Sequence, residues 1–197
     1  MNNLNKIKVD KIDKKKFKIN FCLLNSTISN LNFSSRDLMK YLYLFNSTYF
    51  EDGSLNVLSD QHFSIFLLIK PICKELGLNK RKLYFLLKDV SNNSKNSAIG
   101  IPISVSDHTK INPDYKKYLE DPNILPTAMS KIEFEIEKKN NHYMNIQISF
   151  ELEQSFYMFP MLETIIKEII KKIFKNFQAG YFNLQDNDLI KCSFLNQ

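Results

Sequence analysis

The clearest pattern in the chain is a strict alternation of apolar and polar residues in its last third. Ile132, Phe134 and Ile136 alternate with glutamates, and after a polar stretch at 138–142 the alternation resumes over 143–152. Because successive side chains of a strand point to opposite faces, this pattern places the apolar residues on one face. It predicts a long antiparallel hairpin with one dry face and one wet face.

The period changes after Pro160, from two residues to about 3.6. Apolar residues then recur at helical spacing, and they are Leu162, Ile165, Ile166, Ile169, Ile170, Ile173, Phe174 and Phe177. The stripe predicts an amphipathic helix over 161–178 that ends near Gly180, since glycine is common just after a last helical turn. Isoleucine is only a moderate helix former, so this helix needs a surface on which to pack its stripe.

Weaker signals precede the hairpin. Alternation predicts strands at 17–23 and 98–106. Compact apolar runs favour strands at 62–70 and 82–90, although their periodicity also leaves a buried helix open.

Helix and loop signals complete this part of the chain. Either Ser34 or Ser35 can cap a helix, and Asp52-Gly53 is typical of a break in the chain. Three prolines over 107–128 predict a long loop with one helical turn. Strands followed by one long helix, without an internal repeat, indicate an α+β domain.

The order of these elements resembles the helix-grip fold of the START-like, or polyketide-cyclase-like, superfamily (SRPBCC). The resemblance covers roughly residues 15–180 and depends on the closing hairpin and on the stretch FELEQSFYMFPMLETIIKEIIKKIF at 150–174. It implies a curved antiparallel sheet that grips the C-terminal helix and leaves a lipophilic cavity between them.

One phrase narrows the resemblance further. The residues FPMLET before the helix are similar to the helix start in an uncharacterised branch of this superfamily from photosynthetic lineages. The chain departs from that branch at Ile165, where a glycine is usual, and it lacks the Trp with which the branch tends to end. The superfamily has no universal catalytic set, so no catalytic residue is transferred.

The resemblance makes the dry faces of the strands candidate walls of a ligand cavity. The predicted lining residues are Phe63, Ile65, Ile101, Ile103, Ile146, Ile148 and Phe150, with Ile166 and Ile170 of the helix as the floor. No inward position offers a charge, so we expect an apolar small molecule of the lipid, quinone or pigment class. The protein would carry this ligand, or would be an assembly factor at a membrane complex. The loop at 107–128 is long enough to be a lid over one end.

Positive charge gathers at the N-terminus. Residues 1–18 hold seven Lys against two Asp, a net charge of +5, whereas the whole chain carries +6. This predicts a flexible basic arm at 1–16, one domain at 17–180 and a C-terminal tail at 181–197. Candidate anion contacts in or next to the arm are Lys11, Lys14, Lys15, Lys16 and Lys18.

The basic arm leaves an alternative function open. Dense Lys charge suits RNA or an anionic membrane surface, so the chain could be a non-enzymatic interaction subunit of a larger assembly. A solvated terminus without a partner is the competing interpretation. Part of the charge reflects codon usage, because Lys replaces Arg almost wholly and only two Arg occur.

The chain contains few residues of the types that usually act in catalysis or bind metals. The three His share no metal-ligand spacing and the four Gly form no phosphate loop, so we expect no metal, no cofactor and no catalytic residue. An enzyme is the least favoured class. Three scattered Cys indicate a reducing compartment inside the cell. The cytoplasm fits this expectation, and the resemblance to a branch from photosynthetic lineages implies the plastid stroma as the other candidate. No apolar run approaches the roughly 18 residues of a membrane span.

Overall fold

The computed structural model describes residues 6–25, 33–71, 79–91 and 95–184. The strands are β1 (Lys8–Lys11), β2 (Lys16–Leu24), β3 (Phe50–Val57), β4 (His62–Ile69), β5 (Arg81–Asp89), β6 (Asn96–Pro102), β7 (Leu125–Pro126), β8 (Met129–Asn140) and β9 (Tyr143–Leu152). The helices are α1 (Ser35–Leu44), α2 (Val105–Ile111), α3 (Lys116–Leu119) and α4 (Pro160–Phe182), with the 3-10 turn η2 (Pro113–Tyr115) between α2 and α3.

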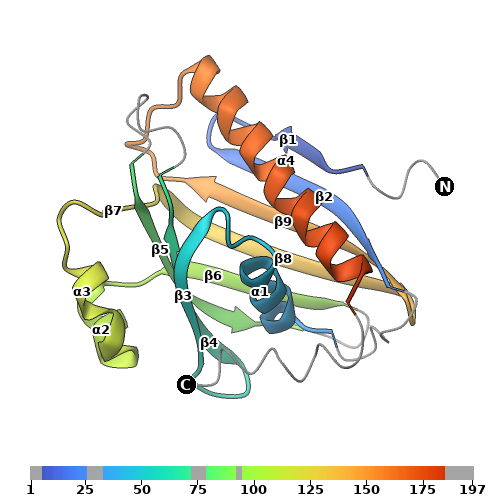
Figure 1. Ribbon diagram of the computed structural model, residues 1–197, viewed down its shortest axis with the longest axis horizontal. Coiled ribbons are helices and arrows are strands. Elements are labelled where there is room, and N and C mark those ends of the chain that lie inside the picture. Colours follow the sequence, from blue (N-terminus) through green and yellow to red (C-terminus); the bar gives the residue numbers. More distant parts are fainter. Residues whose placement is uncertain (1–5, 26–32, 72–78, 92–94, 185–197) are drawn as a thin grey trace.

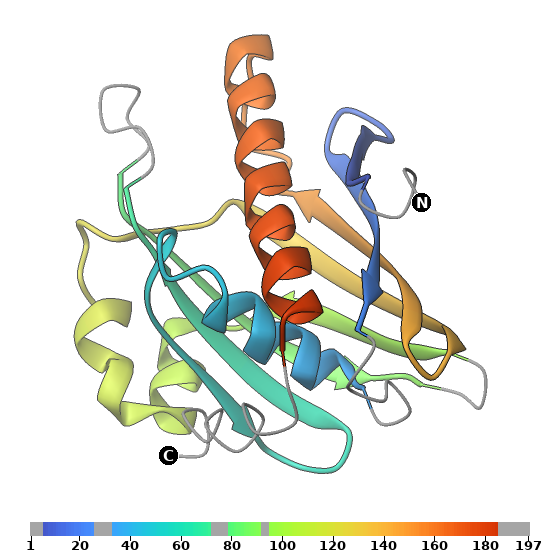
Figure 2. The same ribbon diagram turned by 45° about the vertical axis from the view of Figure 1, so that its right-hand side comes forward.

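The described strands form one sheet in the order β1-β2-β9-β8-β6-β5-β4-β3, and β7 pairs with β5. All of these pairings are antiparallel except the short parallel contact between β7 and β5. The sheet curves around α4, and α1 lies beside α4 on the same face (Figures 1 and 2). The α+β class, the closing hairpin and the gripped C-terminal helix are therefore confirmed.

Strand β4 is buried on both faces, which explains why its sequence runs apolar without alternation. Phe63, Ile65 and Leu67 belong to the main core on the α4 side of the sheet. Phe66 and Leu68 point the other way and form a second core cluster with residues from 119 to 124. The apolar run at 62–70 is thus a strand between two packed layers.

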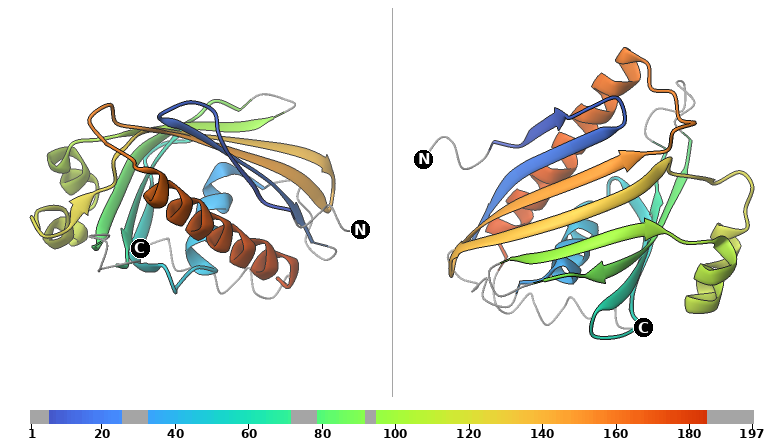
Figure 3. Two further views of the ribbon diagram at one scale, coloured as in Figure 1. Left: turned by 90° about the horizontal axis from the view of Figure 1, so that it is seen from above. Right: turned by 180° about the vertical axis from the view of Figure 1, so that it is seen from behind.

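The segment after β6 is the outer layer of this sandwich and not a lid. Helices α2 and α3 lie outside the curve of the sheet, away from α4 (Figure 3). The Tyr115 hydroxyl on η2 donates hydrogen bonds to Asp52 Oδ1 at 3.1 Å and to the Gly53 carbonyl oxygen at 3.0 Å. The helical turn predicted within 107–128 is present as η2 and α3. The prediction of a lid was wrong, because Phe66 and Leu68 give this segment an apolar surface of its own, and only Thr127 and Ala128 at its end reach the cavity.

Two basic side chains are buried under that outer layer. Lys82 Nζ donates to the carbonyl oxygen of Leu119 at 2.6 Å, where it closes the C-terminal end of α3, and burial lowers the pKa of this lysine. The imidazole of His108 on α2 lies between the rings of Phe66 and Tyr84, and burial lowers its pKa as well. Both groups fix the outer layer to the back of the sheet.

The predicted break at Asp52-Gly53 was also wrong, because β3 continues through both residues. A bulge between Phe50 and Asp52 shifts the register against β4. A Cβ atom on Gly53 would lie 2.9 Å from the Leu67 side chain and 3.0 Å from the Phe66 carbonyl oxygen. The glycine therefore permits a close approach of β3 to β4 and does not mark a turn.

Residues 1–16 were predicted as a flexible arm; residues 1–5 lie outside the described part of the chain, and residues 6–16 are packed against the rest of the domain. Residues 8–11 form β1, which pairs with β2, and Ile7 belongs to the main core. The Lys11 ammonium binds the Glu163 carboxylate of α4, and Lys15 Nζ donates to the carbonyl oxygen of Phe156. These contacts offset the cost of ordering a segment with little apolar content of its own.

Helix α4 continues past Gly180, where the sequence predicted its end. A Cβ atom on this residue would overlap the ring of Phe45, which packs against the helix from α1. The glycine is thus required for close helix packing inside the last turn. Leu184, just after the helix, is also buried, and the predicted tail beyond it lies outside the described residues.

We predict that Ile7→Ala lowers the free energy of unfolding by about 2–4 kcal/mol, because it removes a buried side chain from the core. The control is Ile12→Ala at the turn after β1, where the side chain is 54% exposed and truncation should be nearly silent. Chemical denaturation of both variants measures the difference. Equal stabilities of the two variants would show that the N-terminal segment is a free arm.

We predict that Gly180→Ala destabilises the protein by about 1–3 kcal/mol, because the added methyl group displaces the Phe45 ring. Helix propensity alone would give the opposite sign, a gain of roughly 1 kcal/mol. Thermal unfolding distinguishes the two signs. Ala179→Leu enlarges an exposed neighbour on the same turn and should leave the stability nearly unchanged. A more stable Gly180→Ala variant would contradict the contact between α1 and α4.

Candidate functional site

A cavity of about 370 Å³ lies between one end of the sheet and the N-terminal half of α4. Its apolar lining comes from the strands (Phe50, Ile69, Met129, Phe150, Leu152), from the link after β9 (Phe156, Met158) and from α4 (Leu162, Ile166, Ile169, Ile170, Ile173). The volume falls in the range of roughly 300–1,000 Å³ that is usual for small-molecule sites. The lining is typical of a site for an apolar group.

The cavity exists because the two halves of α4 pack differently. In the C-terminal half, Phe174, Phe177 and Tyr181 are buried, and Phe174 lies against Phe21 with ring centroids 4.8 Å apart. In the N-terminal half, the cavity-lining isoleucines face the sheet and yet remain only half-buried. Figure 2 shows this half of α4 extending beyond the sheet. An apolar stripe that faces a sheet without being covered by it leaves the space that forms the cavity.

Charged contacts hold the N-terminal half of α4 at its edge toward β1. Glu163 binds both Lys11 and, at 2.7 Å, Lys167 of the next helical turn. These hydrogen bonds, the one from Lys11 first, lower the pKa of the Glu163 carboxyl group. The ammonium groups of Lys11 and Lys167 also lie about 6 Å from the Phe17 ring, at 5.9 Å and 6.0 Å from its centroid. The β1–β2 hairpin therefore supports the helix that forms one wall.

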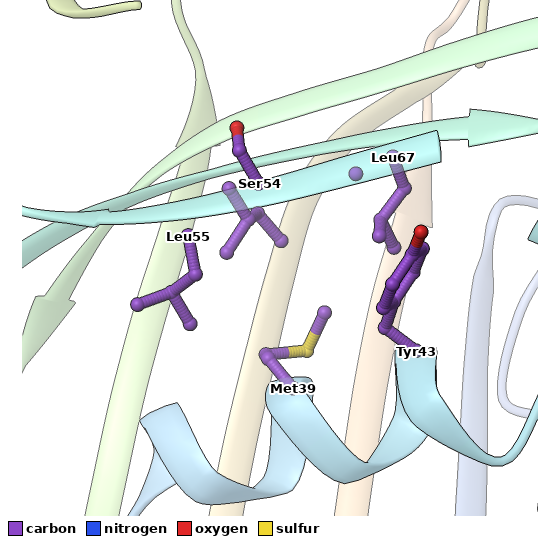
Figure 4. Close-up of a pocket in the computed structure, with 7 residues that line it drawn as sticks. Met39, Tyr43, Ser54, Leu55 and Leu67 are labelled. Carbon is purple, nitrogen blue, oxygen red and sulfur yellow. The ribbon is translucent and has the colours of Figure 1, made fainter. Parts of the chain in front are cut away.

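Of the nine residues predicted to line a cavity, the structure brings Phe150, Ile166 and Ile170 to this one. Four others lie on the same face of the sheet but in its packed core, where they are at most 2% exposed, and these are Phe63, Ile65, Ile146 and Ile148. Figure 4 shows why the sheet is filled near Ile65: Met39 and Tyr43 of α1 point toward Leu55 and Leu67, and only about 10 Å³ stays open there.

The prediction was wrong for Ile101 and Ile103. Ile101 is 53% exposed on the outer face of β6, and Ile103 lies after the end of that strand. The inward positions of β6 are Ala98 and Gly100. A Cβ atom on Gly100 would lie 2.7 Å from the Ile132 side chain, so only small residues fit on this side. The alternation identified the strand but extended it to 106, where α2 has already begun at Val105, and it assigned the faces in reverse.

The cavity also has a polar rim, which the sequence pattern does not predict. Lys70, Asn79, Arg81 and Thr127 line it where β4 ends, β5 begins and the link to β8 passes. Ile69 pairs with Arg81, and the amide of Thr127 donates to the Lys82 carbonyl oxygen at 2.8 Å, so these positions are neighbours. The expectation that no inward position carries a charge is therefore wrong. Lys70 and Arg81 stand at the ends of apolar runs, a position that periodicity assigns to solvent.

The lysines predicted as anion contacts are dispersed. Lys11 and Lys15 are engaged with α4 and with the link that precedes it. Lys14 is exposed at the turn between β1 and β2, while Lys16 and Lys18 are half-buried in β2. No group of three or more His, Cys, Asp or Glu side chains in the described ranges could hold a metal ion. Within the same ranges, no helix is long and apolar enough to span a membrane.

No protein-family model matches the chain, and no curated protein matches its sequence. Solved structures do match. Human StAR-related lipid transfer protein 5 aligns with 89% of this chain and 86% of its own, at a TM-score of 0.59 and 8% identity. The lipid transfer and protein localization domain of human StarD13 covers 90% of this chain and 84% of its own (TM-score 0.58, 6% identity).

A bacterial structure matches over a similar extent. The STAR-related lipid transfer protein from Xanthomonas axonopodis (fragment 25-204) covers 89% of this chain and 92% of its own, at a TM-score of 0.53 and 9% identity. Identities this low establish the fold and leave the ligand open. Together with the curved sheet around α4, these matches show that the chain has the helix-grip fold of START domains.

Proposed function

We propose that the protein binds a lipophilic small molecule in the cavity between the sheet and the N-terminal half of α4. The observation that carries the proposal is the stripe of half-buried isoleucines, Ile166, Ile169, Ile170 and Ile173, which faces the cavity. Covering such a surface is favourable by about 25 cal/mol per Å² of apolar area. A ligand of the lipid, quinone or pigment class could supply the missing cover.

The names of the matched structures support the proposal. Two are lipid transfer proteins and one is a lipid transfer and protein localization domain. Since fold alone does not determine function, their weight depends on the cavity of this chain. The cavity lies between the helix and the sheet, where the fold leaves room for a ligand.

The alternative function, an interaction subunit with a free basic arm, has less support. It requires the N-terminal lysines to be available for RNA or an anionic surface, and two of them bind α4 or its preceding link. It also expects a filled core, whereas a cavity is present. The basic segment therefore supports the cavity wall in this proposal.

We predict that the protein binds the neutral apolar dye Nile red saturably and with a negative heat-capacity change. Ile170→Trp places an indole ring in the cavity and should weaken dye binding at least about tenfold, which corresponds to about 1.4 kcal/mol. The control, Thr164→Trp, adds the same ring at an exposed position of α4 and should bind the dye like the parent. Fluorescence titration with calorimetry measures both quantities.

Ile170 packs partly on the core and also lines the cavity, so the added ring can extend into the cavity and should leave the melting temperature close to that of the parent. A variant that folds and binds the dye as tightly as the parent would place the dye elsewhere. Absence of any dye binding to the parent would remove the basis of the proposal.

A further inference from the structure

The two sides of the cavity differ in chemical character. Its helix wall is purely apolar, from Leu162 to Ile173. The opposite rim carries Lys70 and Arg81, and no Asp or Glu occurs among the described residues that line the cavity. The site is therefore apolar with one cationic side.

The charges of this rim have no partner of opposite sign among the described residues. Lys70 Nζ donates to the Ser47 carbonyl oxygen at 2.7 Å, and Arg81 Nη1 makes one long bond of 3.4 Å to the Pro126 carbonyl oxygen. Neither side chain takes part in the ion pairs of the described ranges. Lys80, the residue that precedes Arg81, pairs instead with Glu51 at 2.8 Å.

Two cations that have no acidic partner in the described part of the chain lie beside an apolar cavity. The guanidinium group of Arg81 offers five N–H donors in a planar fork that suits a carboxylate or a phosphate, and the described residues accept from only one of its nitrogens. Both side chains are half-buried, so a bound anion would be screened less than on an open surface. The rim thus favours a ligand group with negative charge.

Resting on the proposed function, we infer that the ligand is an anionic amphiphile, a molecule with an alkyl or similar apolar chain and one carboxylate or phosphate head group. Its chain lies along the isoleucine stripe of α4, and its head group binds Lys70 and Arg81 at the rim. Asn79 and Thr127 on the same rim supply neutral hydrogen-bonding groups for the remaining oxygens. A neutral lipophile would fill the cavity without supplying the negative charge that the described residues around Lys70 and Arg81 lack.

The test uses ligands that share one alkyl chain and differ only in head group: dodecanoate, dodecyl phosphate, dodecanol and dodecyltrimethylammonium. Below micellar concentrations and at low salt, the parent should bind the two anions at least about tenfold more tightly than dodecanol, because only the anions can form charge-assisted hydrogen bonds with the rim. The ammonium ligand should bind most weakly. Added salt should weaken binding of the anions and leave dodecanol unaffected. The order of carboxylate and phosphate identifies the head group.

The double variant Lys70→Gln/Arg81→Gln should bring dodecanoate to the affinity of dodecanol and leave dodecanol binding unchanged, which also shows that the variant folds. The control Lys88→Gln/Lys110→Gln removes the same charge from exposed positions outside the cavity lining and should bind all four ligands like the parent.

Three results would overturn the inference. Equal binding of dodecanol and the anions to the parent would refute the head-group site and leave apolar binding intact. Loss of dodecanol binding in the double variant would assign Lys70 and Arg81 to the structure of the rim. Failure of the parent to bind any of the ligands would refute the proposed function itself.

Discussion

The aromatic anchor of α4 is the contact on which the rest of the structure depends. Tyr181 lies edge-on to Phe33 and Tyr41, with ring centroids 5.5 Å and 5.9 Å away, and Phe177 packs against Phe21 and Phe45. The buried amide of Asn25 donates to the carbonyl oxygen of Tyr181 at 2.6 Å and so satisfies the C-terminal end of the helix. Because the C-terminal half fixes the direction of the helix axis, the N-terminal half extends over the end of the sheet. The space that remains between them is the cavity.

The distribution of large and small residues also separates a packed half of the domain from an open half. Where α1 and α4 press on the sheet, β6 presents only Ala98 and Gly100, because the neighbouring Leu87 and Ile132 already occupy the space. Packing at interior density leaves no room for a ligand there. At the other end of the sheet, the wall of α4 is made of isoleucines without a covering layer. The protein thus concentrates its close packing in one half and leaves the other half open.

The sequence predicted those parts of the fold in which one face is wet and the other dry, such as the hairpin of β8 and β9 and the stripe of α4. It failed where a tertiary contact determines which residue ends a helix or which face of a strand points inward. Gly180 reads as a helix end and is a packing site for Phe45, and Ile101 reads as core although small residues occupy the inward side of β6. The candidate site was only partly predictable for the same reason: Phe150 and Ile170 follow from periodicity, whereas Arg81 enters the rim because β4, β5 and β7 meet there.

Different residues of α4 stabilise the fold and line the cavity. The two sets can therefore be replaced with different effects. Phe174, Phe177 and Tyr181 lose most of their surface to the core, so their replacement affects the whole domain. Ile166 and Ile169 keep part of theirs, so their replacement costs less stability and changes mainly what the cavity can hold. A fold arranged in this way can exchange its lining without losing its architecture.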